Sequence, residues 1–250
     1  MLTNYHTHHY RCGHAKGEIE DYVLEAIKHG YTELGISCHV PYKDFPEVGT
    51  SQRMNFEDLP LYLNEIDHLQ KKYPEIKILK SLECEYFPSI HEYIKELAAQ
   101  TDYLILAGHF IENDGVYKDA FSFTKPEQLT RYAEQLEVAM STGLFKFLAH
   151  PDLFMILYPE WDAVCEETTH KIAQAANKYD VMLEVNANGL RRKNQPYPSQ
   201  EFWSIIATHY PQTKVIVNAD CHEPDFLNDA YMQRARDIAE DLNLNVITML

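Results

Sequence analysis

The chain has 250 residues, a formal net charge of −16, 45% hydrophobic and 24% charged residues, which is typical of a folded globular protein and excludes a disordered or fibrous one. The acidic excess disfavours nucleic-acid phosphates, and the chain shows neither a secretory signal nor an apolar run of roughly 18 to 20 residues that could span a membrane. Five scattered cysteines without a CxxC pair exclude a disulfide scaffold. We therefore expect a cytoplasmic protein without a nucleic-acid or membrane partner, and the oligomeric state stays open.

Short apolar runs alternate along the chain with segments of helical periodicity. The pattern predicts, in chain order, a strand at 2–5, a helix at 18–29, a strand at 33–37, a helix at 59–69, a strand at 76–82, a helix at 89–99, a strand at 103–107, a helix at 129–140, a strand at 145–149, a helix at 162–179, a strand at 181–185, a helix at 199–209, a strand at 214–219 and a helix at 235–242. The last run, NVITML, predicts an eighth strand or a terminal cap. Since nothing marks a linker, we expect one α/β domain over residues 1–250.

Six of the seven predicted strands lead into histidine, aspartate or glutamate; only the sixth, 181–185, does not. The residues that follow the strands are His6 and His8, His39, Glu83, His109, His150, and Asp220 with His222. The C-terminal ends of the strands of a parallel barrel lie on one rim, so we expect these side chains to converge.

Imidazole and carboxylate are ligands of first-row transition ions. His6 and His8 stand at i and i+2, the spacing that puts side chains on the same face of a strand, and Asp220 and His222 repeat it. The predicted ligands are His6, His8, His14, His39, Glu83, His109, His150, Asp220 and His222. A single ion takes roughly four to six ligands, so more than one ion is implied. Cys84 and Cys221 are predicted to pack on the opposite side of their strands.

Seven ordered motifs between residue 4 and about residue 225 resemble the PHP (polymerase and histidinol phosphatase) superfamily. They are YHTHHYRCGHA, GISCHVP, SLECEYFP, AGHF, LAHPDL, EVNANGLRR and NADCH. The resemblance is specifically to the stand-alone histidinol-phosphate phosphatases. This sequence departs from the family pattern at Tyr5, Glu85, Gly108 and Cys221, none of which is a predicted ligand.

The resemblance implies a distorted (β/α)7 barrel with two to three divalent ions (Zn, Fe or Mn). By analogy, His6, His8, Glu83 and Asp220 hold the first ion, Glu83, His109 and His150 the second, and His14, His39 and His222 the third.

The implied reaction is hydrolysis of a small phosphorylated substrate, L-histidinol phosphate, to L-histidinol and phosphate in histidine biosynthesis, by attack of a metal-bound hydroxide. Glu83, Asp220 and His222 are the candidate catalytic residues, with Asp220 or a histidine protonating the leaving group. Arg191 is the candidate phosphate ligand. The candidate partners of a substrate amine are Glu85, Glu112, Asp114 and Asp119.

Three alternatives stay open. A PHP phosphoesterase for a nucleotide or phosphotyrosine would keep the same ligands. An amidohydrolase-type C–N hydrolase also places H-x-H after its first strand, but it lacks counterparts of His14 and His39. A non-catalytic metal-binding module would be expected to have lost a bridging ligand, whereas all of them are present here.

Overall fold

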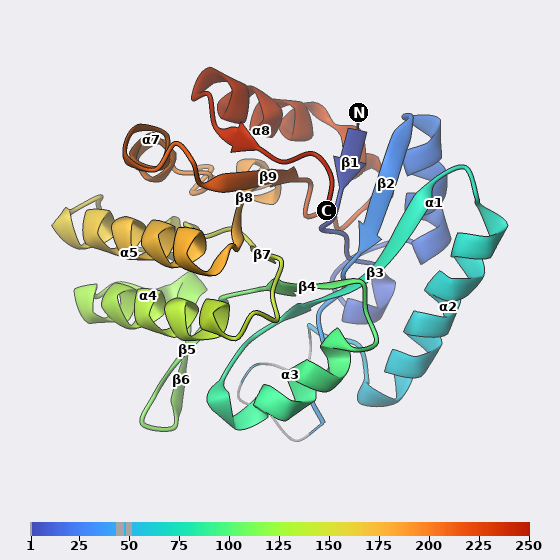
Figure 1. The fold of residues 1–250 in the computed structure, drawn as a ribbon, viewed down its shortest axis with the longest axis horizontal. Coiled ribbons are helices and arrows are strands. Elements are labelled where there is room, and N and C mark those ends of the chain that lie inside the picture. Colours follow the sequence, from blue (N-terminus) through green and yellow to red (C-terminus); the bar gives the residue numbers. More distant parts are fainter. Residues whose placement is uncertain (1, 44–47, 49–51) are drawn as a thin grey trace.

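The computed structural model describes residues 2–43, 48 and 52–250. Its main feature is a curled sheet of eight parallel strands in the order β1-β2-β3-β4-β7-β8-β9-β10 (Figure 1). The strands are β1 Leu2–Asn4, β2 Tyr31–Ile36, β3 Lys77–Cys84, β4 Tyr103–Leu106, β7 Phe147–Leu148, β8 Met182–Asn186, β9 Lys214–Asn218 and β10 Asn245–Val246. All seven predicted strands are confirmed, and NVITML begins with the eighth.

Helices surround the curled sheet, and all seven predicted helices are confirmed (Figure 1). They are α1 Ile19–Lys28, α2 Leu59–Lys72, α3 His91–Ala98, α4 Pro126–Ser141, α5 Ala163–Tyr179, α7 Gln200–His209 and α8 Ala230–Asp241. The side chains of Asp162, Ser199 and Asp229 cap α5, α7 and α8 by accepting hydrogen bonds from backbone N–H groups of the first turn. Within the described residues, no helix combines the length and the apolar character needed to cross a membrane.

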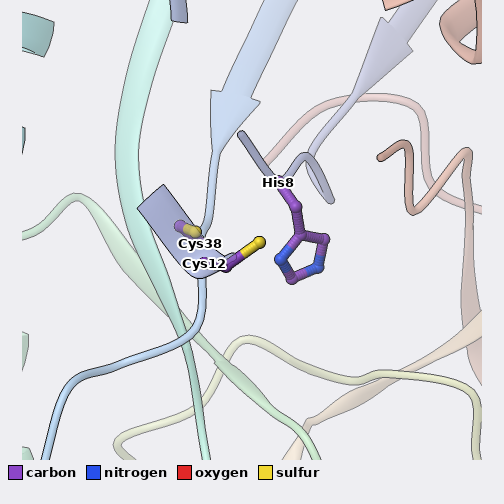
Figure 2. Close-up of side chains that lie close together, drawn as sticks. All are labelled: His8, Cys12 and Cys38. Carbon is purple, nitrogen blue, oxygen red and sulfur yellow. The ribbon is translucent and has the colours of Figure 1, made fainter. Parts of the chain in front are cut away.

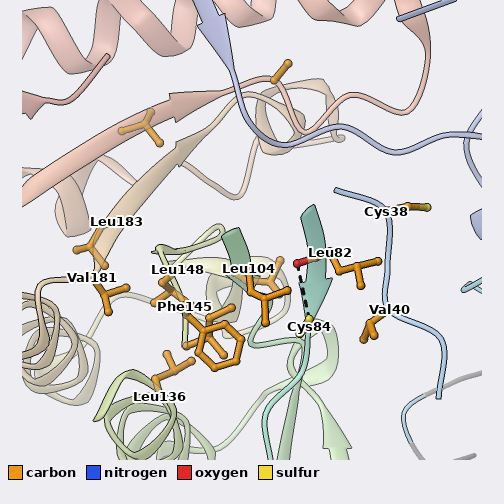
Figure 3. Packing of buried hydrophobic residues seen from close by; sticks show 14 of the residues in the cluster. Cys38, Val40, Leu82, Cys84, Leu104, Leu136, Phe145, Leu148, Val181 and Leu183 are labelled. Atoms are coloured by element: carbon orange, nitrogen blue, oxygen red, sulfur yellow. Dashed lines mark hydrogen bonds between the residues drawn. The ribbon is translucent and has the colours of Figure 1, made fainter. Parts of the chain in front are cut away.

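Alternating side chains explain why the strand sequences are apolar throughout. Leu82, Leu104, Leu148 and Leu183 of four neighbouring strands pack in the main core, together with Leu136 of α4 (Figure 3). Their neighbours Ile105, Phe147 and Met182 belong to a second cluster. Because both faces are covered, only polar residues with a specific role interrupt these runs. Glu83 and Glu184, each following one of these leucines, therefore lie on the other side of the sheet from the leucines.

The barrel is distorted where its first and last main strands meet. β1 and β9 share no regular ladder; instead, the side-chain amide of Asn4 accepts from the Ala219 N–H at 2.7 Å and that of Asn218 from the Tyr5 N–H at 2.8 Å. A single parallel bridge, Thr7 to Cys221, follows. At the opposite end of the strands β10 pairs with β9, and Leu250 packs with the second cluster. The predicted α/β class with a distorted barrel is confirmed.

A hairpin at residues 110–119 and a one-turn helix were not predicted. The hairpin consists of β5 Phe110–Asn113 and β6 Val116–Asp119, and the helix α6 covers Asn188–Arg191. Asp114 and Gly115 both have positive φ, as the tight turn of a two-residue hairpin requires. The Asp-Gly pair could therefore have predicted this hairpin from the sequence. Both elements border the site described next.

Candidate metal centre

The nine predicted ligands lie together at the C-terminal end of the sheet. They surround a cavity of about 430 Å³, and of the described residues that line it eight are predicted ligands, namely His8, His14, His39, Glu83, His109, His150, Asp220 and His222. The ninth, His6, is completely buried and contacts Glu83 and Asp220. The convergence expected from the strand ends is therefore present in the structure.

Glu83, at the end of β3, lies at the centre of the group. Its Oε2 lies 2.8 Å from His39 Nδ1, and its Oε1 lies 3.2 Å from His150 Nε2 and 3.5 Å from His109 Nε2. Oε2 also lies 3.5 Å from His8 Nε2. One carboxylate thus faces histidines from four separate segments, which is the arrangement that a bridging ligand needs.

Ring nitrogens point at one another elsewhere in the site. His6 Nε2 and His8 Nε2 are 3.1 Å apart, and Asp220 Oδ1 lies 3.2 Å from His8 Nε2. His14 Nε2 and His222 Nε2 are likewise 3.1 Å apart. Two facing nitrogens can form at most one hydrogen bond with each other, whereas a cation between them would bind the lone pairs of both.

Buried oxygens without hydrogen bonds support the same interpretation. Within the described part of the chain, Glu83 Oε2 and Asp220 Oδ1 are buried and lie close to histidine nitrogens, but neither forms a hydrogen bond of acceptable geometry. Leaving a buried carboxylate oxygen unsatisfied is costly. Divalent ions between these oxygens and the ring nitrogens would satisfy both, so the residues present fit a metal cluster.

Four of the histidines are anchored through Nδ1, which leaves Nε2 to face the centre. His6 Nδ1 contacts Glu184 at 2.9 Å, and His109 Nδ1 contacts Glu85 at 2.8 Å. The Nδ1 atoms of His14 and His222 lie 3.1 and 3.0 Å from the backbone oxygens of Cys12 and Asp220. Partners of this kind fix the tautomer and orientation of metal-binding histidines.

Glu184 lies in β8, the sixth strand predicted from the sequence, and was not predicted to belong to the site. It is fully buried in β8, and besides His6 its carboxylate accepts from the backbone N–H of His150 at 3.0 Å. Asn186 and Asn218 also donate to it, at 2.7 and 2.9 Å. A single glutamate in the otherwise apolar run VMLEV could have indicated from the sequence that Glu184 has a specific role. β8 therefore supplies a carboxylate that orients the predicted ligands His6 and His150, and it supplies no predicted ligand itself.

We predict that Glu184→Gln lowers zinc affinity by about 10- to 100-fold, since the charge that orients His6 is lost while the side-chain shape is kept. Zinc titration against a competing chelator measures this. Glu166→Gln, in the first turn of the outer helix α5, is the control and should bind zinc normally. Unchanged affinity in Glu184→Gln would remove Glu184 from the support of the centre.

The ring pKa values of four predicted ligand histidines are shifted in two directions. Burial opposes the charged form of His8, but the adjacent Asp220 carboxylate raises its pKa to about 9. The pKa of His6 is also raised well above its usual value, because Asp220, Glu184 and Glu83 outweigh burial. Burial instead lowers the pKa of His222 to about 4 and holds that of His39 well below its usual value.

These values predict that metal binding to metal-free protein releases protons. At pH 7, His6 and His8 are protonated and must lose a proton to bind an ion, whereas His39 and His222 are already neutral. Zinc affinity should therefore rise with pH by about tenfold per unit per released proton, and the contribution of His8 should level off above about pH 9. Calorimetry in buffers of different ionisation enthalpy counts the protons. A binding heat that does not depend on the buffer would contradict this prediction.

The cysteines mainly pack, as predicted for Cys84 and Cys221, whose thiols contact the Leu82 carbonyl and the Thr7 hydroxyl. Cys12 and Cys38 are also buried, but their sulfurs gather beside His8, on the side of its ring that carries Nδ1 (Figure 2). The Cys38 thiol, followed by His14 and His8, lowers the pKa of Cys12, whereas burial raises that of Cys38. The Cys12 sulfur thus lies near the Nδ1 side of the His8 ring, whereas His8 Nε2 faces Glu83 and Asp220.

Arg191, the predicted phosphate ligand, is not among the described residues that line the cavity. The Arg191 guanidinium binds Asp229 through two hydrogen bonds of 2.8 and 2.9 Å and donates to the backbone oxygens of Ala219 and Phe226. It therefore fastens α6 to the loop before α8. Arg192, the next residue, lines the cavity instead. The one-turn helix α6 ends at Arg191, so the two arginines point to different places.

Comparisons with known proteins agree with this geometry. A model of the PHP domain family matches residues 4–188. A "Probable histidinol-phosphatase" of Deinococcus radiodurans is 24% identical over 258 residues, covering 96% of this chain and 93% of its own. A protein of the same name from Schizosaccharomyces pombe is 25% identical over 244 residues, and the match covers 85% of this chain and 78% of that protein. The crystal structure of histidinol phosphate phosphatase from Lactococcus lactis, complexed with Zn, L-histidinol and phosphate, is 20% identical and covers 98% of this chain and 95% of its own, with a TM-score of 0.75.

The family match covers well over half of the chain and includes His6 through His150. Asp220 and His222 follow the matched range but line the same cavity. The order of the motifs, the curled parallel sheet and the family match all agree. The chain therefore belongs to the PHP domain family.

Proposed function

We propose that the protein is a metal-dependent phosphomonoesterase that hydrolyses L-histidinol phosphate to L-histidinol and phosphate. The observation that carries this proposal is the convergence of seven histidines, Glu83 and Asp220 around one cavity. The relatives named histidinol-phosphatase, and the Lactococcus lactis structure with Zn, L-histidinol and phosphate, support the choice of substrate.

The distances support a division of the ligands among two to three ions. His6, His8 and Glu83 offer ligand atoms within 4.8 Å of one another, as the proposed first ion requires together with Asp220. Glu83 reaches towards His109 and His150 for the second ion. The third would use His14, His39 and His222, and His39 also lies close enough to Glu83 to adjoin the second. The donor set suits Zn, Fe or Mn.

Bound ions would activate water and neutralise the charge of the phosphate oxygens. The residues of the chain orient the reacting groups. Asn186 and Asn188 donate to Asp220 Oδ2 at 3.1 and 3.2 Å, which fixes this carboxylate with Oδ1 towards His8. Asp220 and His222 line the cavity and are the proposed catalytic residues besides Glu83, with Asp220 or a histidine of the cavity as the proton donor to the leaving alcohol. Arg192 replaces Arg191 as the proposed phosphate contact.

We further propose that residues 1–250 form one PHP metallo-phosphoesterase domain that acts in the cytoplasm on a small substrate. The net charge of −16 supports the absence of a nucleic-acid partner, since it repels polyanions. A protein of the PHP family can still bind phosphate, because the charge within the cavity differs from that of the whole molecule.

A phosphate-release assay on metal-replete protein tests the function. The panel contains L-histidinol phosphate, phosphotyrosine, nucleoside monophosphates and a set of amides. We expect kcat/KM for L-histidinol phosphate to exceed that for each other phosphate ester by at least about 100-fold, and no amide cleavage. Similar values for all the esters would reject L-histidinol phosphate as the substrate, and amide cleavage would favour the C–N hydrolase alternative.

A further inference from the structure

Three segments outside the predicted ligand set contribute to the described cavity wall, and one of them supplies Val48, Gln52 and Arg53. The end of the β5–β6 hairpin contributes Phe110, Asp119 and Phe121, and the chain after β8 contributes Asn188, Arg192 and Tyr197. Of the carboxylates among the described lining residues, Glu83 and Asp220 are predicted ligands and Asp119 is not. Asp119 therefore places a negative charge beside the metal centre that the metal ligands do not account for.

The environment of Asp119 leaves this charge unbalanced. Asp119 is half-buried, and its Oδ1 accepts a hydrogen bond of 2.8 Å from the backbone N–H of Phe121, which caps the short helix Ala120–Ser122. In the described part of the chain it forms no ion pair with a lysine, arginine or histidine. One oxygen is thus committed to the cap, while the other has no cationic partner among the described residues.

The other three carboxylates that might meet a substrate amine are engaged elsewhere. Glu85 is buried against His109, at 2.8 Å from Nδ1. Glu112 lies 3.8 Å from Arg131 and accepts a hydrogen bond from the Gly115 N–H. Asp114 is exposed at the hairpin turn. None of the three is among the described residues that line the cavity, so Asp119 is the remaining candidate.

Two arginines give the same cavity positive groups, Arg53, which lies 3.6 Å from Glu85, and Arg192. The Arg192 guanidinium lies 5.1 Å from the centre of the Phe121 ring, and its Nε donates to the Tyr197 hydroxyl at 3.1 Å. The Phe121 ring in turn stacks on the predicted ligand His109, with ring centres 5.6 Å apart. Arg192 and the metal centre thus suit the anionic end of a substrate, and Asp119 suits a cationic end.

We infer that Asp119 selects phosphate monoesters whose alcohol carries a protonated amine, by accepting a charge-assisted hydrogen bond from that ammonium group. This inference rests on the proposed function and adds the residue that distinguishes amino-alcohol phosphates from other monoesters. The ammonium supplies the missing partner of Asp119, whereas an ester without an amine leaves the carboxylate unpaired. Esters with a second anionic group are disfavoured by repulsion at the same carboxylate.

The test compares Asp119→Asn, Asp114→Asn and wild type on two matched pairs of substrates. One pair is L-histidinol phosphate and its deamino analogue, and the other is O-phosphoethanolamine and ethyl phosphate. The asparagine side chain keeps an oxygen that can accept from the Phe121 N–H, so Asp119→Asn should fold normally, with an unchanged melting temperature. Asp114→Asn removes the same charge from the same hairpin but outside the cavity.

We expect wild type to favour the amine of each pair by about tenfold or more in kcat/KM, and this ratio to fall towards one in Asp119→Asn alone. A ratio near one in wild type, an unchanged ratio in Asp119→Asn, or an equal loss in Asp114→Asn would overturn the inference. If L-histidinol phosphate is no better than other esters, the proposed function fails by itself. The second pair then still decides the role of Asp119 by the same criteria.

Discussion

Glu83→Gln is expected to reduce kcat/KM by more than about a thousandfold and to lower the bound metal content, the largest effect of any single substitution. The reason is that the Glu83 carboxylate faces His8, His39, His109 and His150 and is proposed to be shared by two ions. An amide of the same shape offers only one ligand oxygen and no charge, so both ions are weakened together. Elemental analysis and phosphate release are measured on the same preparation.

Glu85→Gln is the matched control, because Glu85 lies two residues after Glu83, directly beyond the end of β3. Glu85 contacts His109 at 2.8 Å but faces no other predicted ligand in the described structure. Its replacement should cost only about 10- to 100-fold in metal affinity or activity. Equal losses in the two variants, or retained activity in Glu83→Gln, would contradict the central position of Glu83.

The adjacent arginines should respond to removal in different ways. Arg191→Ala is expected to lower the free energy of unfolding by about 2–4 kcal/mol, because it leaves the Asp229 carboxylate and the backbone oxygens of Ala219 and Phe226 without their donors. Arg192→Ala should change stability by less than about 0.5 kcal/mol, since its side chain is largely exposed. Denaturant unfolding of both variants measures this difference.

The kinetic expectation is the reverse. Arg192→Ala should raise KM for phosphate esters by about tenfold, because a guanidinium at the cavity wall is lost. Where Arg191→Ala remains folded, its KM should stay within about twofold of wild type. A large KM increase in Arg191→Ala at normal stability would restore the original assignment of phosphate binding to Arg191.

The convergence of the predicted ligands could be foreseen from the sequence because strand geometry fixes their place. A residue at the end of a parallel strand lies on a known rim, so His39, His109 and His150 converge although more than a hundred residues separate the first from the last. The place of Glu83 could be predicted for the same reason, because it lies near the C-terminal end of β3. The alternation of side chains places it on the side of the sheet away from Leu82, which packs in the main core.

Residues in turns were harder to predict, because no fixed period sets their direction. Arg191 and Arg192 could not be distinguished because α6 is a single helical turn, in which one residue rotates the side chain by about 100°. Asp119 could not be distinguished from Glu112 and Asp114 until the hairpin was known. Glu184 was overlooked because it lies on the one predicted strand without a predicted ligand. It contacts His6 Nδ1 and the backbone N–H of His150 and does not line the described cavity.

Anomalous X-ray diffraction from crystals of zinc-replete protein tests the shared metal centre most directly. We expect at least two zinc peaks in the cavity, with both carboxylate oxygens of Glu83 at about 2.0–2.2 Å from metal, and with His6 and His8 on one ion and His109 and His150 on another. Zinc peaks that lie away from Glu83, or a single ion bound without it, would contradict the shared metal centre on which the proposed activity depends.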